Sequence, residues 1–210
     1  MENSGVKSVI ILRGGPAVGK TTLAEELTCK MPKSARIEQD ILRYMIVGGL
    51  VAAKSGLHPS NAPEEYLRQC RLGDLNALAL ARNFAVAGFI PVIAGFNGGE
   101  SAETFYELNH PRSRTWYPSP ELLSHELTDL NCYQIILDAP SDVLEVRLKT
   151  REFDSETIEF VLDQRQRFLD SIDKSQVWLQ VNTIENTPQE IAELILEKLS
   201  EMEPSVKVTE

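Results

Sequence analysis

Short apolar runs alternate with longer helical patterns along most of this chain of 210 residues. Such an alternation is typical of crossover units, in which helices cover both faces of a mostly parallel sheet. We therefore expect a three-layer α/β fold with five strands. The apolar runs place these strands at Val9–Leu12, Ala35–Glu38, Ile90–Ala94, Tyr133–Leu137 and Val177–Val181.

The helical patterns between the strands differ in how much of their surface is apolar. Glu64–Val86 is apolar around much of its circumference, lacks proline and stops near Gly88, which predicts a buried packing helix. The last helix is expected over Pro188–Glu201, behind Thr187 as its N-cap. Residues 95–130 are the least regular part of the chain, and such long irregular segments are more often functional than inert.

Composition excludes several classes of protein. A formal net charge of -10 argues against a sequence-independent nucleic-acid coat, because neutralising phosphates requires clustered Lys and Arg. The three cysteines, Cys29, Cys70 and Cys132, lack metal-binding spacing and are expected to be reduced. No signal peptide or bilayer-length apolar run is evident, so we expect a cytoplasmic protein with no membrane partner and no metal other than Mg²⁺.

The most specific signal is a glycine-rich loop directly after the first apolar run. It matches the phosphate-binding pattern G-x-x-x-x-G-K-[ST], with a strand expected before it and a helix after it. Glycines let successive backbone N–H groups face a phosphate, and the helix N-terminus adds positive potential. We expect Lys20 to reach the β- and γ-phosphates of ATP or GTP, and the Thr21 hydroxyl to bind Mg²⁺. The predicted nucleotide-binding residues are Gly14, Gly15, Pro16, Ala17, Val18, Gly19, Lys20, Thr21 and Thr22.

An acid and a base follow the second predicted strand, at Asp40 and Arg43. One interpretation is a helix that Asp40 caps, with Arg43 in solvent. The other places Asp40 at the carboxyl end of a strand, in the crevice where α/β sheets bind ligands. There it would accept a proton from an attacking hydroxyl, while Arg43, one turn further on, binds an anionic group of the substrate.

Three arginines in the second half of the chain are further candidates. Arg147 and Arg151 are four residues apart, so a helix stacks them on one face, either in solvent-exposed ion pairs or facing a phosphoryl group in transfer. Arg165 falls inside the apolar stripe of a helix expected over Ser155–Asp173. A buried guanidinium there needs a carboxylate or a phosphate, unless its side chain extends to the edge of the stripe.

Together these motifs resemble the P-loop kinases of small molecules and nucleic-acid ends. Asp40-x-x-Arg43 resembles the polynucleotide 5′-hydroxyl kinase and zeta-toxin-like branch, where the aspartate is the general base and the arginine contacts substrate. Arg151–Phe168 is similar instead to the lid and following helix of thymidylate kinase-like proteins. The resemblance implies a P-loop NTPase fold with one kinase domain over residues 1–201 and a helical lid at about 147–157. Residues 202–210 are short and polar, so we expect a disordered tail there.

One departure from the kinase pattern concerns the metal ion. Many of these kinases have an acidic residue for Mg²⁺ at the end of the third strand, but here that run reads Ile93-Ala94-Gly95-Phe96-Asn97. The ion would then rely on Thr21, the phosphates and water, with Asp40 or Asp138 in its outer shell, or else the site is weakened. Candidates for an acceptor pocket, or alternatively for packing, lie in the irregular segment: Phe96, Phe105, Tyr106, His110, Arg112, Arg114, Trp116 and Tyr117.

The leading hypothesis from the sequence is an ATP-dependent phosphotransferase. Its γ-phosphoryl acceptor is a hydroxyl, or a nucleotide phosphate, of a small molecule or nucleic-acid end. Two alternatives remain open: an NTPase that uses Asp138 for its metal and water as nucleophile, and a nucleotide-binding module without catalysis. The hypothesis assigns catalysis to Lys20, Asp40, Arg147 and Arg151, and substrate binding to Arg43 and Arg165.

Overall fold

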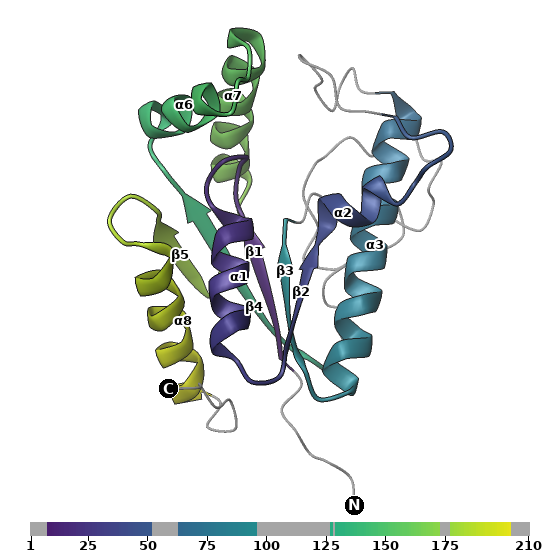
Figure 1. The fold of residues 1–210 in the computed structure, drawn as a ribbon, viewed down its shortest axis with the longest axis vertical. Helices are drawn as coiled ribbons and strands as arrows, with labels where there is room; N and C mark the ends of the chain where they lie inside the picture. The colour runs from purple at the N-terminus through teal and green to yellow at the C-terminus, as the bar shows by residue number, and fades with distance from the viewer. Residues whose placement is uncertain (1–7, 52–62, 96–126, 128, 173–176, 203–210) are drawn as a thin grey trace, which may run out of the picture.

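Five strands form a parallel sheet in the order β2-β3-β1-β4-β5 (Figure 1). The computed structural model describes residues 8–51, 63–95, 127, 129–172 and 177–202. Because β1 lies in the middle, the loop that follows it opens between its neighbours β3 and β4. The strands are β1 (Ser8–Arg13), β2 (Ser34–Glu38), β3 (Ile90–Ala94), β4 (Asn131–Asp138) and β5 (Leu179–Asn182).

Six helices of the described residues surround this sheet. In Figure 1, α1 and α8 lie side by side, with α8 next to β5 and α1 nearer the middle of the sheet; α3 lies beside β2 and β3, and α6 and α7 lie above the carboxyl end of β4. The helices are α1 (Lys20–Lys30), α2 (Gln39–Tyr44), α3 (Glu64–Val86), α6 (Ser141–Thr150), α7 (Ser155–Ser171) and α8 (Pro188–Met202).

Alternate residues of the central strands pack into two separate hydrophobic cores, one on each face of the sheet. Ile10 and Leu12 of β1 pack with residues of α1, α6, α7 and α8 on one face of the sheet. Val9 and Ile11 pack with α3 residues such as Leu78 on the other face. Strands buried on both faces read as continuous apolar runs, which is why β1 and β4 were recognisable in the sequence.

The predicted three-layer α/β fold with a parallel five-stranded sheet is confirmed. The last strand begins two residues later than predicted, at Leu179, because its ladder starts opposite Ile135 of β4. Thr187 and Glu190 cap each other at the start of α8: the Glu190 carboxylate accepts from the Thr187 backbone N–H at 2.7 Å, and the Thr187 hydroxyl accepts from Glu190 N–H at 3.3 Å. The predicted tail beyond Met202 lies outside the described residues.

No helix in the described part of the chain is long and apolar enough to span a bilayer.

Candidate active site

The loop between β1 and α1 has the backbone shape that phosphate binding requires. Gly14 and Gly19 have φ angles of 139° and 101°, and Ala17 is left-handed at 62°. A Cβ atom at Gly14 would clash with the carbonyl oxygen of Leu137, so glycine lets the loop lie directly against the end of β4. Residues 14–19 therefore form a tight turn that leads into the N-terminus of α1.

The Lys20 ammonium folds back onto this loop. Its Nζ donates to the carbonyl oxygens of Gly14 at 2.9 Å and Gly15 at 2.8 Å. The pKa of Lys20 is lowered to about 8, mainly by burial. Within this net shift, the Asp40 carboxylate raises the pKa and the Arg151 guanidinium lowers it. Lys20, Asp40 and Arg151 thus interact electrostatically although they come from three separate parts of the chain.

Asp40 lies in the first turn of α2 and its side chain is exposed. The interpretation of Asp40 as the helix cap is wrong, because the N-cap is Glu38 and no side chain caps this helix. The neighbouring Gln39 is buried, its amide donating to the Cys70 carbonyl of α3 at 3.4 Å. Buried Gln39 thus anchors the start of α2, and Asp40 projects from it at the carboxyl end of β2.

Arg43 lies inside the protein and not in solvent. Only 4% of its surface is exposed, and its guanidinium lies 5.2 Å from the ring centre of Tyr44 and 4.9 Å from that of Tyr66. It also donates to the Val51 carbonyl at 3.2 Å. These contacts hold Arg43 between α2 and α3, so the alternative of a solvated arginine is wrong. Binding of an anionic substrate group by Arg43 stays a prediction.

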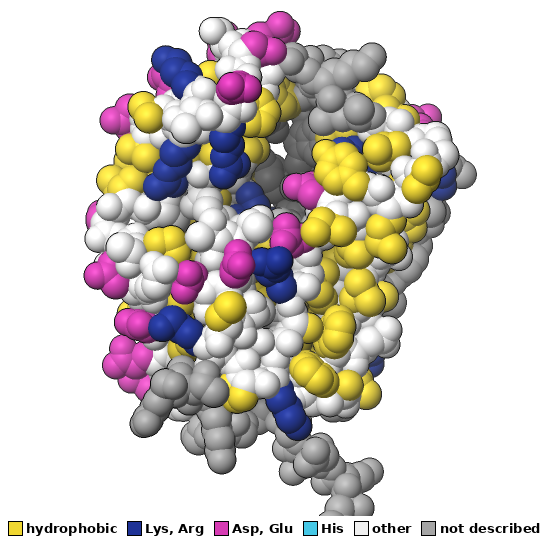
Figure 2. All heavy atoms as spheres, viewed as in Figure 1, with side chains coloured by type: hydrophobic (Ala, Val, Ile, Leu, Met, Phe, Trp, Pro, Cys, Tyr) yellow, Lys and Arg dark blue, Asp and Glu magenta, His cyan; other side chains and the backbone are white. Residues whose placement is uncertain are grey.

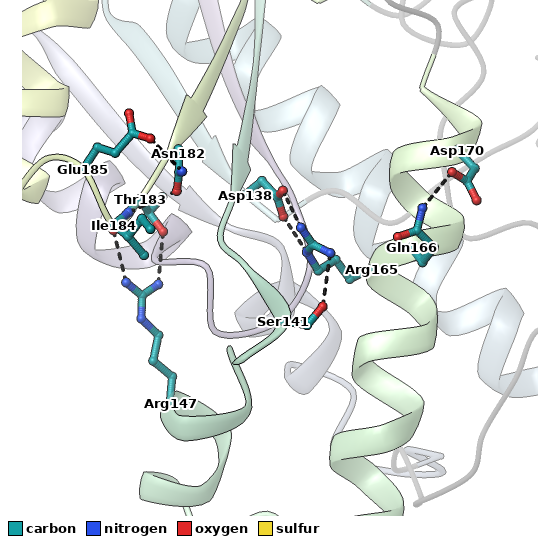
Figure 3. Close-up of polar contacts among 10 residues, drawn as sticks. All are labelled: Asp138, Ser141, Arg147, Arg165, Gln166, Asp170, Asn182, Thr183, Ile184 and Glu185. Carbon is teal, nitrogen blue, oxygen red and sulfur yellow. Dashed lines mark hydrogen bonds and ion pairs between the residues drawn. The ribbon is translucent and has the colours of Figure 1, made fainter. Parts of the chain in front are cut away.

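Arg147 and Arg151 both line a pocket of about 230 Å³ beside the loop. Arg147 donates to the Ala17 carbonyl at 3.3 Å. It also donates to Thr183, at 3.1 Å to the hydroxyl and at 3.1 Å to the carbonyl (Figure 3). α6 ends at Thr150 and Arg151 is its C-cap residue, so the two arginines are not both inside the helix as expected, but both line the same pocket. The described residues that line it are Ala17, Val18, Gly19, Thr22, Leu23, Leu137, Arg147, Arg151, Thr183, Asn186, Pro188 and Ile191.

The connection from β5 to α8 is the part of this pocket that the sequence analysis missed. Thr183, Asn186 and Pro188 lie on it, at the carboxyl end of the last strand. The available signal was the polar run after β5, because the carboxyl ends of parallel strands meet at one edge of the sheet.

Arg165 forms an ion pair with the Asp138 carboxylate. Its Nε and Nη2 donate to the two oxygens of Asp138, each at 2.7 Å, and its Nη1 donates to the Ser141 hydroxyl at 3.3 Å (Figure 3). The alternative that Arg165 merely extends to the edge of α7 is therefore wrong. Both oxygens of the Asp138 carboxylate, which was a candidate for metal binding, therefore accept hydrogen bonds from Arg165.

The donors near the loop fit a magnesium ion carried mainly by phosphates and water. Thr21 follows Lys20 in the first turn of α1, and its side chain is exposed. The end of β3 offers no carboxylate within the described residues, and Gly95 there lies against the Lys20 stem, with 3.8 Å between Lys20 Cε and the position that a Cβ of Gly95 would occupy. Across the same residues, no three His, Cys, Asp or Glu side chains are grouped to hold a metal by themselves.

Figure 2 displays a hollow at the top of the molecule with Lys and Arg side chains on its α6 side and acidic side chains on its α2 side. This separation puts positive charge beside the loop and a carboxylate across from it. The aromatic and basic candidates of the irregular segment, from Phe96 to Tyr117, lie outside the described residues.

Comparison with solved structures supports the fold at low sequence identity. The tunicamycin resistance protein of Deinococcus radiodurans is 19% identical, with a TM-score of 0.58 over 97% of this chain and 98% of that one. A sugar kinase from Janibacter sp. HTCC2649 is 15% identical, with a TM-score of 0.55 over 95% and 98%. The APS kinase of Mycobacterium tuberculosis, solved with AMPPNP and APS, is 15% identical, with a TM-score of 0.50 over 92% and 97%.

The chain has the fold of P-loop kinases. No protein-family model matches the sequence, and no curated protein does. At these identities the likeness concerns the fold and not the choice of substrate.

Proposed function

We propose that this protein is an ATP-dependent phosphotransferase that moves the γ-phosphoryl group of ATP to a hydroxyl of a small molecule or nucleic-acid end. One observation carries the proposal: the Lys20 ammonium donates to the Gly14 and Gly15 carbonyls of the loop, and the Asp40 carboxylate and the Arg151 guanidinium lie close enough to shift its pKa. A lysine that binds phosphate, a carboxylate that accepts a proton and an arginine that stabilises charge are the groups that phosphoryl transfer to a hydroxyl uses. The kinases of similar fold, one of them solved with AMPPNP and APS, support the same reaction class.

Each residue then has a defined task. Lys20 leaves the carbonyls of Gly14 and Gly15 and binds the β- and γ-phosphates, together with the N–H groups of the loop. Asp40 accepts the proton of the acceptor hydroxyl, and Arg151 stabilises the charge on the migrating group. Mg²⁺, held by the Thr21 hydroxyl and by phosphate oxygens, would supply further charge neutralisation.

Arg147 lines the pocket that would hold the nucleoside of the bound nucleotide. Its bonds to Ala17 and Thr183 join the loop to the β5–α8 connection, across the pocket. We propose that residues of about 147–157 form a lid over bound nucleotide, within one domain of residues 1–201. Closing that lid would exclude water and suppress hydrolysis in competition with transfer.

The two alternatives are supported unequally. An NTPase that binds its metal through Asp138 is disfavoured, because both oxygens of that carboxylate accept from Arg165. A non-catalytic nucleotide-binding module is favoured by one observation, the lack of a carboxylate at Ala94 and Gly95, where β3 ends.

Transfer of label from γ-labelled ATP to a panel of nucleosides, nucleotides, nucleic-acid ends, sugars and small antibiotics tests the proposal. We expect one acceptor class to be labelled, and Asp40→Asn to lower that rate by roughly 100- to 10,000-fold while ATP still binds. Lys20→Ala should lower both binding and transfer. Asp142→Asn, the same change on an exposed residue of α6, is the matched control.

Each other outcome assigns a different function. ADP release that no acceptor stimulates identifies an NTPase, and tight ATP binding with neither activity identifies the non-catalytic module. A full transfer rate in Asp40→Asn would show that another group accepts the proton.

A further inference from the structure

The Asp138–Arg165 ion pair links α7 to the end of the central sheet beside the phosphate-binding loop (Figure 3). Both bonds are 2.7 Å long, and the two side chains are only 20% and 14% exposed. A guanidinium held side-on by two short bonds to one carboxylate has a fixed plane. The pair therefore determines where the cation of Arg165 lies and which way it faces.

Asp138 projects from a rigid position. The preceding carbonyl, that of Leu137, lies directly against Gly14 of the loop. The backbone carbonyl of Asp138 itself accepts from the Thr183 N–H at 2.8 Å, which ties it to the end of β5. The carboxylate is thus fixed on both sides by backbone contacts and can orient a partner.

Arg165 meets the loop at Gly15. Its Cβ lies 3.8 Å from the position that a Cβ of Gly15 would occupy. The carbonyl of the same Gly15 accepts from the Lys20 ammonium at 2.8 Å. Lys20 and Arg165 therefore approach one residue at the start of the loop.

Arg147 contacts the loop at a different place, the Ala17 carbonyl, where the pocket begins. Arg147 thus meets the loop on the side of the pocket, whereas the base of the Arg165 side chain meets it at Gly15, whose carbonyl accepts from Lys20. Because a P-loop lysine reaches the β- and γ-phosphates, the start of the loop corresponds to the γ-phosphate end of a bound nucleotide.

From these contacts we infer that Arg165 binds the γ-phosphate of ATP and that Asp138 is the positioning residue that aims it. This inference rests on the proposed function. It gives a role to the Asp138 carboxylate, which the proposed function does not assign to the metal ion. Among the described residues, the bonds to Asp138 and Ser141 use three of the five N–H groups of Arg165. Two remain to be donated to phosphate oxygens without breaking the ion pair.

Calorimetry with Mg²⁺ and either AMPPNP or ADP tests this without knowledge of the acceptor. The decisive quantity is the ratio of the Kd for ADP to the Kd for AMPPNP, since only AMPPNP carries a γ-phosphoryl group. We expect Asp138→Asn and Arg165→Lys each to lower this ratio by about tenfold, because each loses the two-pronged bond, and to leave the ADP affinity unchanged. The double variant should lose no more than either single variant, since both act through one contact.

Asp170→Asn, the same substitution on an exposed residue of α7, should keep the wild-type ratio. An unchanged ratio in Asp138→Asn, or tighter AMPPNP binding, would overturn the inference; the second result would mean that the carboxylate competes with phosphate for Arg165. Equal loss of both nucleotides with a lower melting temperature would mean that the pair only stabilises the fold. A wild-type protein that binds neither nucleotide would overturn the proposed function, and this inference with it.

Discussion

The ammonium of Lys20 donates to two backbone carbonyls, and under the proposed function a triphosphate draws it away from them when it binds. Burial brings its pKa down to about 8, so near that pH about half of the protein holds a neutral amine. Phosphate oxygens favour the charged form, so binding should return a proton to the lysine.

We predict that ATP binding at pH 8 takes up about half a proton, and that ATP affinity falls as the pH rises above 8. Calorimetry in two buffers with different ionisation enthalpies measures the uptake. Lys30→Ala, on a half-buried residue at the C-terminal end of the same helix, should leave it unchanged. Binding at pH 8 without proton exchange would mean that Lys20 is fully charged in the free protein.

The same shift affects folding stability in a defined pH window. Between about 8 and 10.5 the unfolded chain holds a proton on Lys20 that the folded protein has lost. The unfolded state therefore binds more protons, so the contribution of this group to the free energy of unfolding rises with pH across that window.

Gly14 and Gly48 offer a matched comparison of two glycines. Gly14→Ala forces a side chain onto a φ of 139° and against the Leu137 carbonyl, so we predict a loss of at least about 2 kcal/mol in the free energy of unfolding. A Cβ added at Gly48 would have no heavy atom within 4 Å, so Gly48→Ala should change stability by less than about 1 kcal/mol. Urea unfolding measures both, and equal effects would contradict the close packing of the loop.

At the scale of whole elements, the Asp154 side chain caps the N-terminus of α7. The Asp154 carboxylate accepts from the Thr157 N–H at 2.7 Å, at the turn that joins α6 to α7. Asp154→Ala should lower the free energy of unfolding by about 1 kcal/mol, while Asp154→Ser, which retains a capping oxygen, should recover most of it. Urea unfolding of the two variants makes the comparison, and an equal loss in both would mean that the carboxylate acts through its charge.

The elements themselves were largely predictable from sequence because their apolar patterns are local. β1 and β3 follow from the continuous apolar runs Val9–Leu12 and Ile90–Ala94, and α3 follows from the long, largely apolar stretch Glu64–Val86, which lacks proline. The loop from Gly14 to Thr22 was recognisable because its spacing carries a mechanism.

The partners of individual side chains were not predictable, because they depend on long-range packing. Arg165 and Asp138 are 27 residues apart and meet only because α7 lies over the end of β4. The position of Arg43 between Tyr44 and Tyr66 likewise depends on the packing of α2 on α3. No local pattern in the sequence reports such a tertiary contact.

For the molecule as a whole, the sheet separates two hydrophobic cores. One core joins the loop residue Val18 to α1, α6 and α8, while the other joins β1 and β3 to α3. In the proposed enzyme the first supports the nucleotide and the second supports α2 and α3, from which Asp40 and Arg43 act.

The three cysteines report on this packing. Cys29 is exposed, whereas burial raises the pKa of Cys70 to about 11 and that of Cys132 to about 12. At pH 8 the Cys70 thiolate is then populated in only about one molecule in a thousand. We predict that one thiol reacts rapidly with a disulfide reagent in native protein, that Cys29→Ser abolishes this fast phase, and that urea exposes the others; two fast thiols would contradict the described packing.

The two-sided arrangement of β1 has a consequence for how this chain can diverge. Replacements that remodel α3 press on Val9 and Ile11, while Ile10 and Leu12 keep their own neighbours on the other face. In the proposed enzyme, a lineage can thus exchange one acceptor for another while the machinery that holds its phosphate donor is inherited intact.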